Sequence, residues 1–183
     1  MTLKTLTNDN VAIGLWIALI AALSIGGSLA FACAAPLAAV AALAGAKMKS
    51  GEGLTLIIAA WLSNQIVGYG ILNYPITADS FAWGAAIGVA SVVAFFGARA
   101  VTVSAGASAL ALAGAFLAAF AAYEAALYGV GFVLGSSDEA FSMAVIERIF
   151  QINLVSFAGL LLLHRAAVAL SLIRTDAGTT ATA

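Results

Sequence analysis

Charged residues are scarce in this chain. Only 8% of its 183 residues are Asp, Glu, Lys or Arg, whereas 64% are hydrophobic and the mean hydropathy is +1.12. Soluble domains typically contain about 25% charged residues. The net charge of −1 also provides no basic surface for nucleic acid. The composition therefore excludes an ordinary soluble domain and a nucleic-acid-binding protein, and it indicates an integral membrane protein.

Cysteine and histidine occur once each, as Cys33 and His164. One cysteine excludes an intramolecular disulfide and a cysteine-based metal cluster, and one histidine excludes a haem held by two histidines of this chain. The sequence has no Gly-x-x-x-x-Gly-Lys-[Ser/Thr] loop for ATP hydrolysis. It also has no mid-span lysine for retinal and no Gly-x-Ser-Gly motif with a partnering histidine. We therefore expect no cofactor and no enzymatic activity.

Long apolar segments predict an all-α fold, a polytopic membrane bundle that forms one domain over 1–183. A crossing helix needs about 20 apolar residues. The run Val11–Ala46 is too long for one helix and is interrupted by Gly26-Gly27-Ser28 and by Pro36. The expected helices cover approximately 9–30, 36–48, 53–73, 79–100, 104–134 and 139–173. Six crossings result, or five if Val11–Ala46 crosses only once.

Positive charges predict the orientation of these segments. In the six-helix arrangement one side of the membrane receives all the basic loops and ends, which contain Lys4, Lys47, Lys49, Arg99, Arg165 and Arg174. The positive-inside rule places this side in the cytoplasm. We therefore expect both termini in the cytoplasm of a bacterial inner (plasma) membrane, whereas five crossings would leave the N-terminus outside.

Polar and aromatic residues cluster on the third predicted helix. Trp61, Asn64, Gln65, Tyr69 and Asn73 fall within about half of its circumference at 100° per residue. An unpaired amide buried in hydrocarbon costs about 1–3 kcal/mol, so Asn64 and Gln65 need partners. Those partners are either a bound ligand or neighbouring helices, and the sequence leaves both interpretations open.

Glu124, Glu147 and Arg148 are charges inside apolar segments. Each costs about 2.5–3.5 kcal/mol at the centre of a spanning helix, so we expect them to pair or to serve a ligand. Glu147 and Gln151 share a helical face. Arg148 points about 100° away from Glu147, which makes Glu124 on the fifth helix its candidate partner. A Glu–Arg pair that only fixes helix register is the alternative.

Counting residues inward from the uncharged loops brings these polar groups to a similar depth. At 1.5 Å per residue, Gln65 and Glu147 lie about 12 Å deep and Glu124 about 16 Å deep. We therefore predict an outward-facing polar and aromatic pocket, with no metal ligands assigned. Its predicted lining residues are Trp61, Asn64, Gln65, Tyr69, Asn73, Tyr123, Glu124, Glu147, Arg148 and Gln151.

The chain resembles the substrate-binding S components of energy-coupling factor transporters. The resemblance lies in its size, its six predicted spans, its inward termini and the polar residues in the outward half of its helices. The resemblance implies a vitamin or transition-metal ligand, and partnership with a transmembrane scaffold and two ATPase subunits in the lipid bilayer. It also implies scaffold docking through a small-residue face, for which Ala18, Ala22, Ser24 and Ser28 are candidates.

A second hypothesis comes from a different class of protein. The abundant Ala and Gly, with small-xxx-small spacings such as Gly84/Gly88, favour close helix packing. The chain would then be an accessory or assembly subunit of a larger respiratory or photosynthetic complex, in which the buried polar groups hold helices together. Saturable binding of a ligand by the isolated protein distinguishes the first hypothesis from the second.

Overall fold

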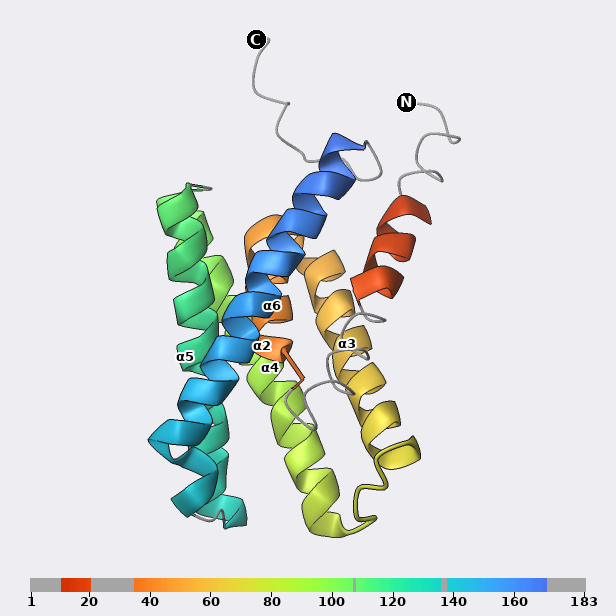
Figure 1. Cartoon of the computed structure of the whole chain (residues 1–183), viewed down its shortest axis with the longest axis vertical. Coiled ribbons are helices and arrows are strands. Elements are labelled where there is room, and N and C mark those ends of the chain that lie inside the picture. The colour runs from red at the N-terminus through yellow and green to blue at the C-terminus, as the bar shows by residue number, and fades with distance from the viewer. Residues whose placement is uncertain (1–10, 21–34, 107, 136–137, 171–183) are drawn as a thin grey trace.

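The computed structural model describes residues 11–20, 35–106, 108–135 and 138–170 (Figure 1). A helix at Val11–Ile20 is followed by five others: α2, Leu37–Lys47; α3, Ser50–Gly70; α4, Ala78–Ala105; α5, Ala109–Leu134; and α6, Met143–Ala169. A short 3₁₀ helix, η1, covers Asp138–Phe141. The described residues include no strand, so the expected all-α class is confirmed.

Three of these helices, α4, α5 and α6, are long and apolar enough to cross a membrane. They contain 28, 26 and 27 residues, which correspond to about 39–42 Å of helix. The bilayer core is about 30 Å thick. The chain is therefore a membrane protein with a helical bundle, as its composition predicts.

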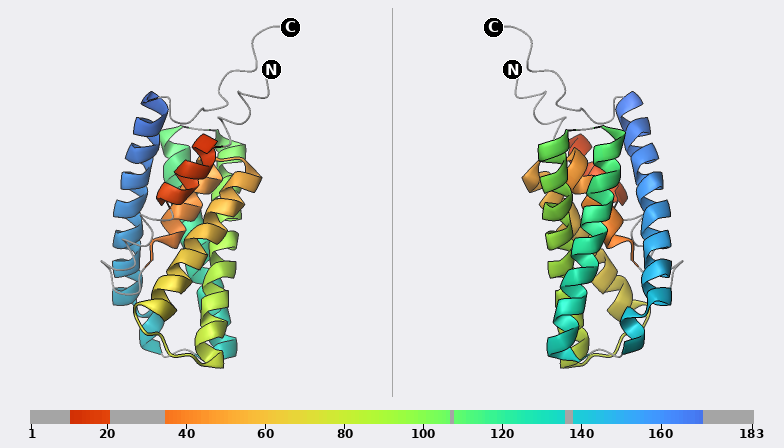
Figure 2. Two further views of the ribbon diagram at one scale, coloured as in Figure 1. Left: turned by 90° about the vertical axis from the view of Figure 1, so that its right-hand side faces the viewer. Right: turned by 90° about the vertical axis from the view of Figure 1, so that its left-hand side faces the viewer.

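The centre of the bundle is the short helix α2. Every residue from Leu37 to Gly45 is buried, and α3, α4, α5 and α6 all contact it. Figures 1 and 2 show these longer helices around it. A helix that is apolar all round is stable only when it is enclosed on all sides. The alanines of α2 allow the close approach that this position requires.

α2 has only eleven residues and therefore rises about 16 Å. That length covers roughly half of the hydrocarbon core, so α2 is too short for the full crossing expected of helix 36–48. It begins midway along the bundle and ends beside the C-terminal part of α4 (Figure 1). We call that end of the molecule the basic end, and the opposite end, which carries the 71–77 loop and η1, the loop end.

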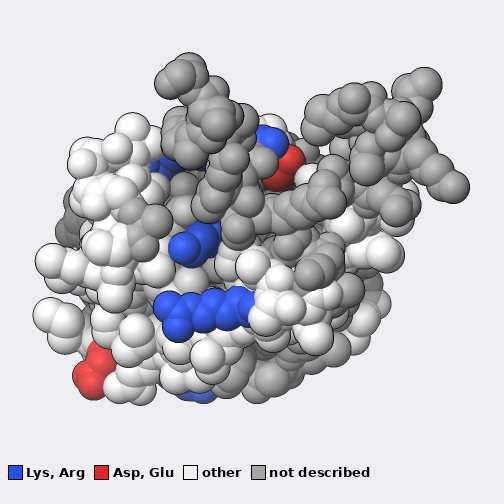
Figure 3. All heavy atoms as spheres, turned by 90° about the horizontal axis from the view of Figure 1, so that it is seen from above, with Lys and Arg blue, Asp and Glu red and all other residues white. Residues whose placement is uncertain are grey.

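The basic end gathers most of the described positive charge. α2 ends at Lys47, Arg99 lies in the last two turns of α4, and Arg165 lies near the end of α6. Lys and Arg side chains are visible over this face in Figure 3. The Nη1 of Arg99 donates a hydrogen bond to the Met48 carbonyl at 3.0 Å, which connects α4 to the segment after α2.

The turn between α4 and α5 lies further along the chain than the predicted one, since the sequence places a helix end near residue 100, where Arg99 is the first charge after a long apolar run. α4 continues to Ala105 because Arg99 bonds across to Met48, and because Thr102 and Ser104 donate to carbonyls of their own helix. Gly106, with φ of 73°, then ends the helix in a conformation that favours glycine. Ser108 caps α5 by accepting a hydrogen bond from the Ala111 amide at 3.1 Å.

Candidate functional site

The N-terminal end of α2 is held inside the bundle by Asn153 of α6. The Asn153 Oδ1 accepts a hydrogen bond from the Ala39 amide at 2.9 Å, and its Nδ2 donates to the Ile149 carbonyl at 2.9 Å. Asn153 is only 1% exposed. The first amides of any helix lack partners within that helix. Asn153 thus supplies an acceptor where water is excluded.

Ring contacts between α5 and α6 show which part of α5 lies at this level. Phe116 stacks on Phe157 with centroids 5.1 Å apart, and Phe120 meets Phe150 at 5.1 Å. Asn153 lies between Phe150 and Phe157 along α6. Tyr123 and Glu124 therefore lie about one turn beyond the start of α2, toward the loop end.

A shared contact with Phe95 places α3 in the same way. Gly45 of α2 and Gly53 of α3 both lie against Phe95 of α4. Leu37 is eight residues from Gly45, or about 12 Å, and Asn64 is eleven residues from Gly53, or about 16 Å. Since α2 and α3 are antiparallel and both extend from the turn that joins them toward the loop end, Asn64 lies about one turn beyond the start of α2. We call the level that contains Asn64, Tyr123 and Glu124 the polar level.

Glu124 contains the most unusual atom of the polar level. Its Oε1 is buried and has no hydrogen-bond partner among the residues that the structure describes. The neighbouring Tyr123 is 7% exposed and Asn64 is 6% exposed. Buried oxygen atoms in folded proteins are nearly always hydrogen-bonded, and an unsatisfied one costs about 1–3 kcal/mol. Glu124 is therefore the predicted residue that most requires a partner from outside the described chain.

Three other predicted residues of α3 pack against α4. The Trp61 Nε1 donates to the Gly84 carbonyl at 2.8 Å, and its indole lies against Gly88. The Gln65 Oε1 approaches Gly84 so closely that a Cβ there would lie 2.6 Å from it. The Tyr69 hydroxyl shares a 3.1 Å hydrogen bond with Ser80. The two glycines accommodate these side chains, so this part of the predicted set holds helices together.

Substitution of Trp61 by phenylalanine tests this packing role. It removes the bond to Gly84 and keeps most of the aromatic surface, so we expect a loss of about 1 kcal/mol in the free energy of unfolding. Thermal unfolding of the purified protein in detergent measures the change. Phe81 to leucine, which removes the 4.9 Å stacking on Tyr69 near the loop end, is a comparison that leaves the Trp61 bond intact. If the Trp61→Phe protein is as stable as wild type, the hydrogen bond from the indole does not hold α3 against α4, and Trp61 has a role other than packing.

The remaining predicted residues face outward. Asn73 is exposed in the α3–α4 loop, with φ of 54° and a 3.3 Å bond from its Nδ2 to the Ile71 carbonyl. Glu147, Arg148 and Gln151 are exposed on α6, where the Gln151 Nε2 donates to the Glu147 Oε1 at 3.1 Å. The structure therefore does not bring these four side chains to the buried polar level.

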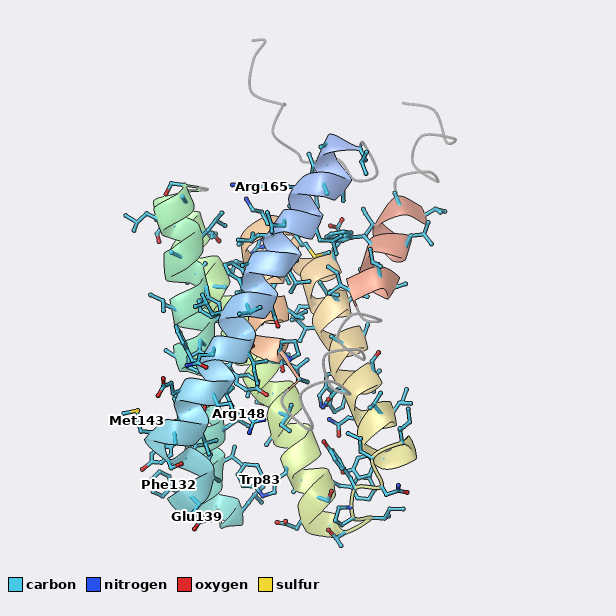
Figure 4. All side chains as sticks on the ribbon, viewed as in Figure 1. Trp83, Phe132, Glu139, Met143, Arg148 and Arg165 are labelled. Carbon is cyan, nitrogen blue, oxygen red and sulfur yellow. The ribbon has the colours of Figure 1, made fainter. Side chains whose placement is uncertain are left out.

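The expected pairing of Glu124 with Arg148 is wrong. No described residue, Arg148 included, pairs with the Glu124 Oε1, and Arg148 is exposed on the other side of α6 from the buried Asn153. The depth of Glu147 is also corrected. η1 and Ser142 precede α6, which begins at Met143, so Glu147 lies about 6 Å along the helix. Figure 4 shows Arg148 in the same half of the molecule as Met143 and Glu139, and Arg165 in the other half.

Two buried polar residues of α6 lie outside the predicted pocket. One is Asn153, and the other is His164, which is 6% exposed and whose ring centroid lies 5.8 Å from that of Trp16. Its Nδ1 has no hydrogen-bond partner in the described part of the chain. The sequence signal for both was a polar residue inside an apolar helix. Their burial depends on the rotation of α6, since Asn153, Phe157, Leu160 and His164 form its inward face.

The described residues include no group of three or more His, Cys, Asp or Glu side chains that would hold a metal ion. Among known proteins, no family model, curated protein or solved structure matches this chain. The assignment of function therefore depends on the geometry of the polar level and on the composition of the membrane helices.

Proposed function

We propose that this protein is the solute-binding membrane component of a small-solute uptake system, and that Glu124 holds the solute at the polar level. The observation that carries the proposal is the buried Glu124 Oε1, which no described residue meets with a hydrogen bond. A hydrogen-bond donor or a positively charged group of a solute would satisfy this oxygen. The Tyr123 hydroxyl beside Glu124 in the sequence, and the Asn64 amide at the same level along the bundle, would orient the same molecule.

The position of α2 supports the same proposal. α2 occupies the bundle axis in the half near the basic end, and among the described segments no helix continues its line toward the loop end (Figure 2). The polar level lies just beyond the start of α2, where this central helix is missing from the bundle. Broken or half-length helices are a common way to place a solute near the middle of a membrane protein.

The orientation and the partners belong to the same proposal. α3 has 21 residues, or about 31 Å, which is long enough to cross with α4, α5 and α6. Its Trp61, Gln65 and Tyr69 pack against α4 and are only partly exposed, so crossing leaves only part of each side chain in contact with lipid. By the positive-inside rule the basic end faces the cytoplasm of a bacterial inner membrane. Separate ATPase and scaffold subunits would drive uptake, as the resemblance to S components implies.

Substitution of Glu124 by glutamine tests the solute site. Glutamine keeps the shape of the side chain and removes its charge, so we expect about a tenfold loss in solute affinity, equivalent to about 1.4 kcal/mol. Native mass spectrometry of the purified protein with a defined panel of water-soluble vitamins and amines identifies the solute. Titration of wild type and variant then measures the dissociation constants.

Glu147 to glutamine is the matched control, because Glu147 is an exposed carboxylate of the same membrane region. We expect it to bind the solute as wild type does. Equal losses in both variants would indicate a general effect of charge. Wild-type affinity in Glu124→Gln, or no saturable binding of any small solute, would contradict the proposal.

The accessory-subunit hypothesis also has a specific observation in its favour. Trp61 and Tyr69 already find hydrogen-bond partners within the bundle, as interhelical packing requires. A pull-down in mild detergent from the native membrane separates the two functions. Recovery of ATPase and scaffold subunits supports uptake, whereas a stoichiometric place among respiratory or photosynthetic subunits supports the accessory role.

A further inference from the structure

α6 lies at the edge of the bundle, and one of its faces contacts no other described helix. In both views of Figure 2 this helix forms an outer border of the molecule. We define the outer face of α6 by six exposed residues: Glu147, Arg148, Gln151, Val155, Ala158 and Leu162. Val155 is 71% exposed and Leu162 is 68% exposed. The face is therefore available to another molecule in the membrane.

The charges of this face flank its midline symmetrically. At 100° per residue, Glu147 and Arg148 point about 100° apart, and the midline between them passes close to Gln151 and Leu162. The buried residues Asn153 and His164 point to the opposite side of the helix. An acidic and a basic group thus lie on the two sides of one exposed stripe at nearly the same depth.

Lipid is a poor partner for this arrangement. A charged side chain that faces hydrocarbon costs up to about 2.5–3.5 kcal/mol. The internal bond between Gln151 and Glu147 satisfies only one carboxylate oxygen, and Arg148 makes no ion pair with any described residue. Ala158 lies on the stripe and Gly159 beside it, and no atom of the described residues lies within 4 Å of where a Cβ would stand at Gly159. These two small residues would let another helix approach closely.

Two-fold symmetry converts this pattern into two attractive pairs. If two copies meet through the outer face of α6 about an axis along the membrane normal, the Glu147 side of one copy faces the Arg148 side of the other. The same pair repeats across the axis. The surface is therefore complementary in charge to itself, at matching depth in both copies.

We propose that the outer face of α6 binds the same face of a second copy, so that the protein forms a parallel homodimer in the membrane. Glu147 of each copy pairs with Arg148 of the partner. Ala158 and Leu162 form the apolar part of the contact. This interface lies on the side of α6 opposite to Asn153, so dimer formation and solute binding at Glu124 can be tested independently.

Charge reversal distinguishes this pairing from other causes of association. In Glu147→Arg both pairs become Arg–Arg, and in Arg148→Glu both become Glu–Glu. We expect each variant alone to raise the dimer dissociation constant about tenfold or more. When the two variants are mixed, every pair joins opposite charges, so a heterodimer should form with nearly wild-type affinity. Fluorescence energy transfer between donor- and acceptor-labelled proteins diluted into liposomes measures all combinations.

Cysteine crosslinking in native membranes locates the contact. In a Cys33→Ser background, Ala158→Cys should form a disulfide-linked dimer, whereas Leu117→Cys, on α5 and 54% exposed, should not. The proposal is overturned if wild type is monomeric, if single reversals leave the dimer intact, or if the mixed variants fail to associate. Crosslinking of Ala158→Cys only to a different protein overturns it too. We expect Glu124→Gln to retain the dimer, so that failure of the solute site and failure of the dimer can be told apart.

Discussion

Gly45 to alanine will lower the free energy of unfolding by as much as about 3 kcal/mol. A Cβ at this position would lie 2.7 Å from the Phe95 carbonyl oxygen, 2.9 Å from the Ala98 Cβ and 3.1 Å from the Arg99 amide nitrogen. Two of these three atoms belong to the α4 backbone, which no side-chain rotation can move. α2 and α4 must therefore separate along the basic end, where α2 is enclosed by its neighbours.

Separation would also weaken the polar contacts between the same two segments. The Thr102 hydroxyl lies 3.4 Å from the Gly45 carbonyl, and Arg99 bonds to Met48 at 3.0 Å. Thermal unfolding in detergent measures the loss of stability. Gly129 to alanine on α5 is the matched control, because no atom of the described residues lies within 4 Å of where a Cβ would stand at Gly129. Alanine favours the helix over glycine by about 1 kcal/mol, so this variant should lose no stability. A Gly45→Ala protein as stable as Gly129→Ala would contradict the close packing of α2 on α4.

The helical class could be predicted from the sequence, because apolar runs and low charge are properties of single segments. The central position of α2 could not be derived in the same way. Its alanines allow close packing on any side, but which helices surround it depends on contacts such as Gly45 against Phe95. The sequence predicts the turn after α4 near residue 100, because Arg99 is a charge that suggests a helix end. The turn lies at Gly106 instead, since Arg99 bonds to a carbonyl of another segment and the helix continues past it.

The candidate site was predictable in part. The burial of Tyr123 and the partial burial of Glu124 agree with an inward orientation of their part of α5. For α3, the spacing identified a shared face of the helix, but not that Gly84 and Gly88 of α4 would receive Trp61 and Gln65. For α6, the rotation of the helix about its own axis determines which of its polar residues are buried. Asn153 faces inward and Arg148 faces outward, and no property of the isolated segment distinguished these two polar residues.

That rotation matters because Asn153 holds the start of α2. Asn153 to leucine will lower the free energy of unfolding by up to about 3 kcal/mol, since the Ala39 amide loses its acceptor in a place that water does not reach. Leucine is close to asparagine in size, so little of the loss comes from a cavity. Hydrogen exchange followed by mass spectrometry provides a local readout. Amides at the start of α2 should exchange faster, while those of α5 should not.

Gln151 to leucine is the matched control, because it removes an amide side chain two residues away on the exposed face of the same helix. In detergent, at concentrations where the protein is monomeric, this variant should be as stable as wild type or more stable. Wild-type stability and exchange in Asn153→Leu would show that packing alone fixes α2. A loss confined to Asn153→Leu would instead show that one hydrogen bond from α6 fixes the start of α2. The same bond would then also fix where the polar level that contains Glu124 begins.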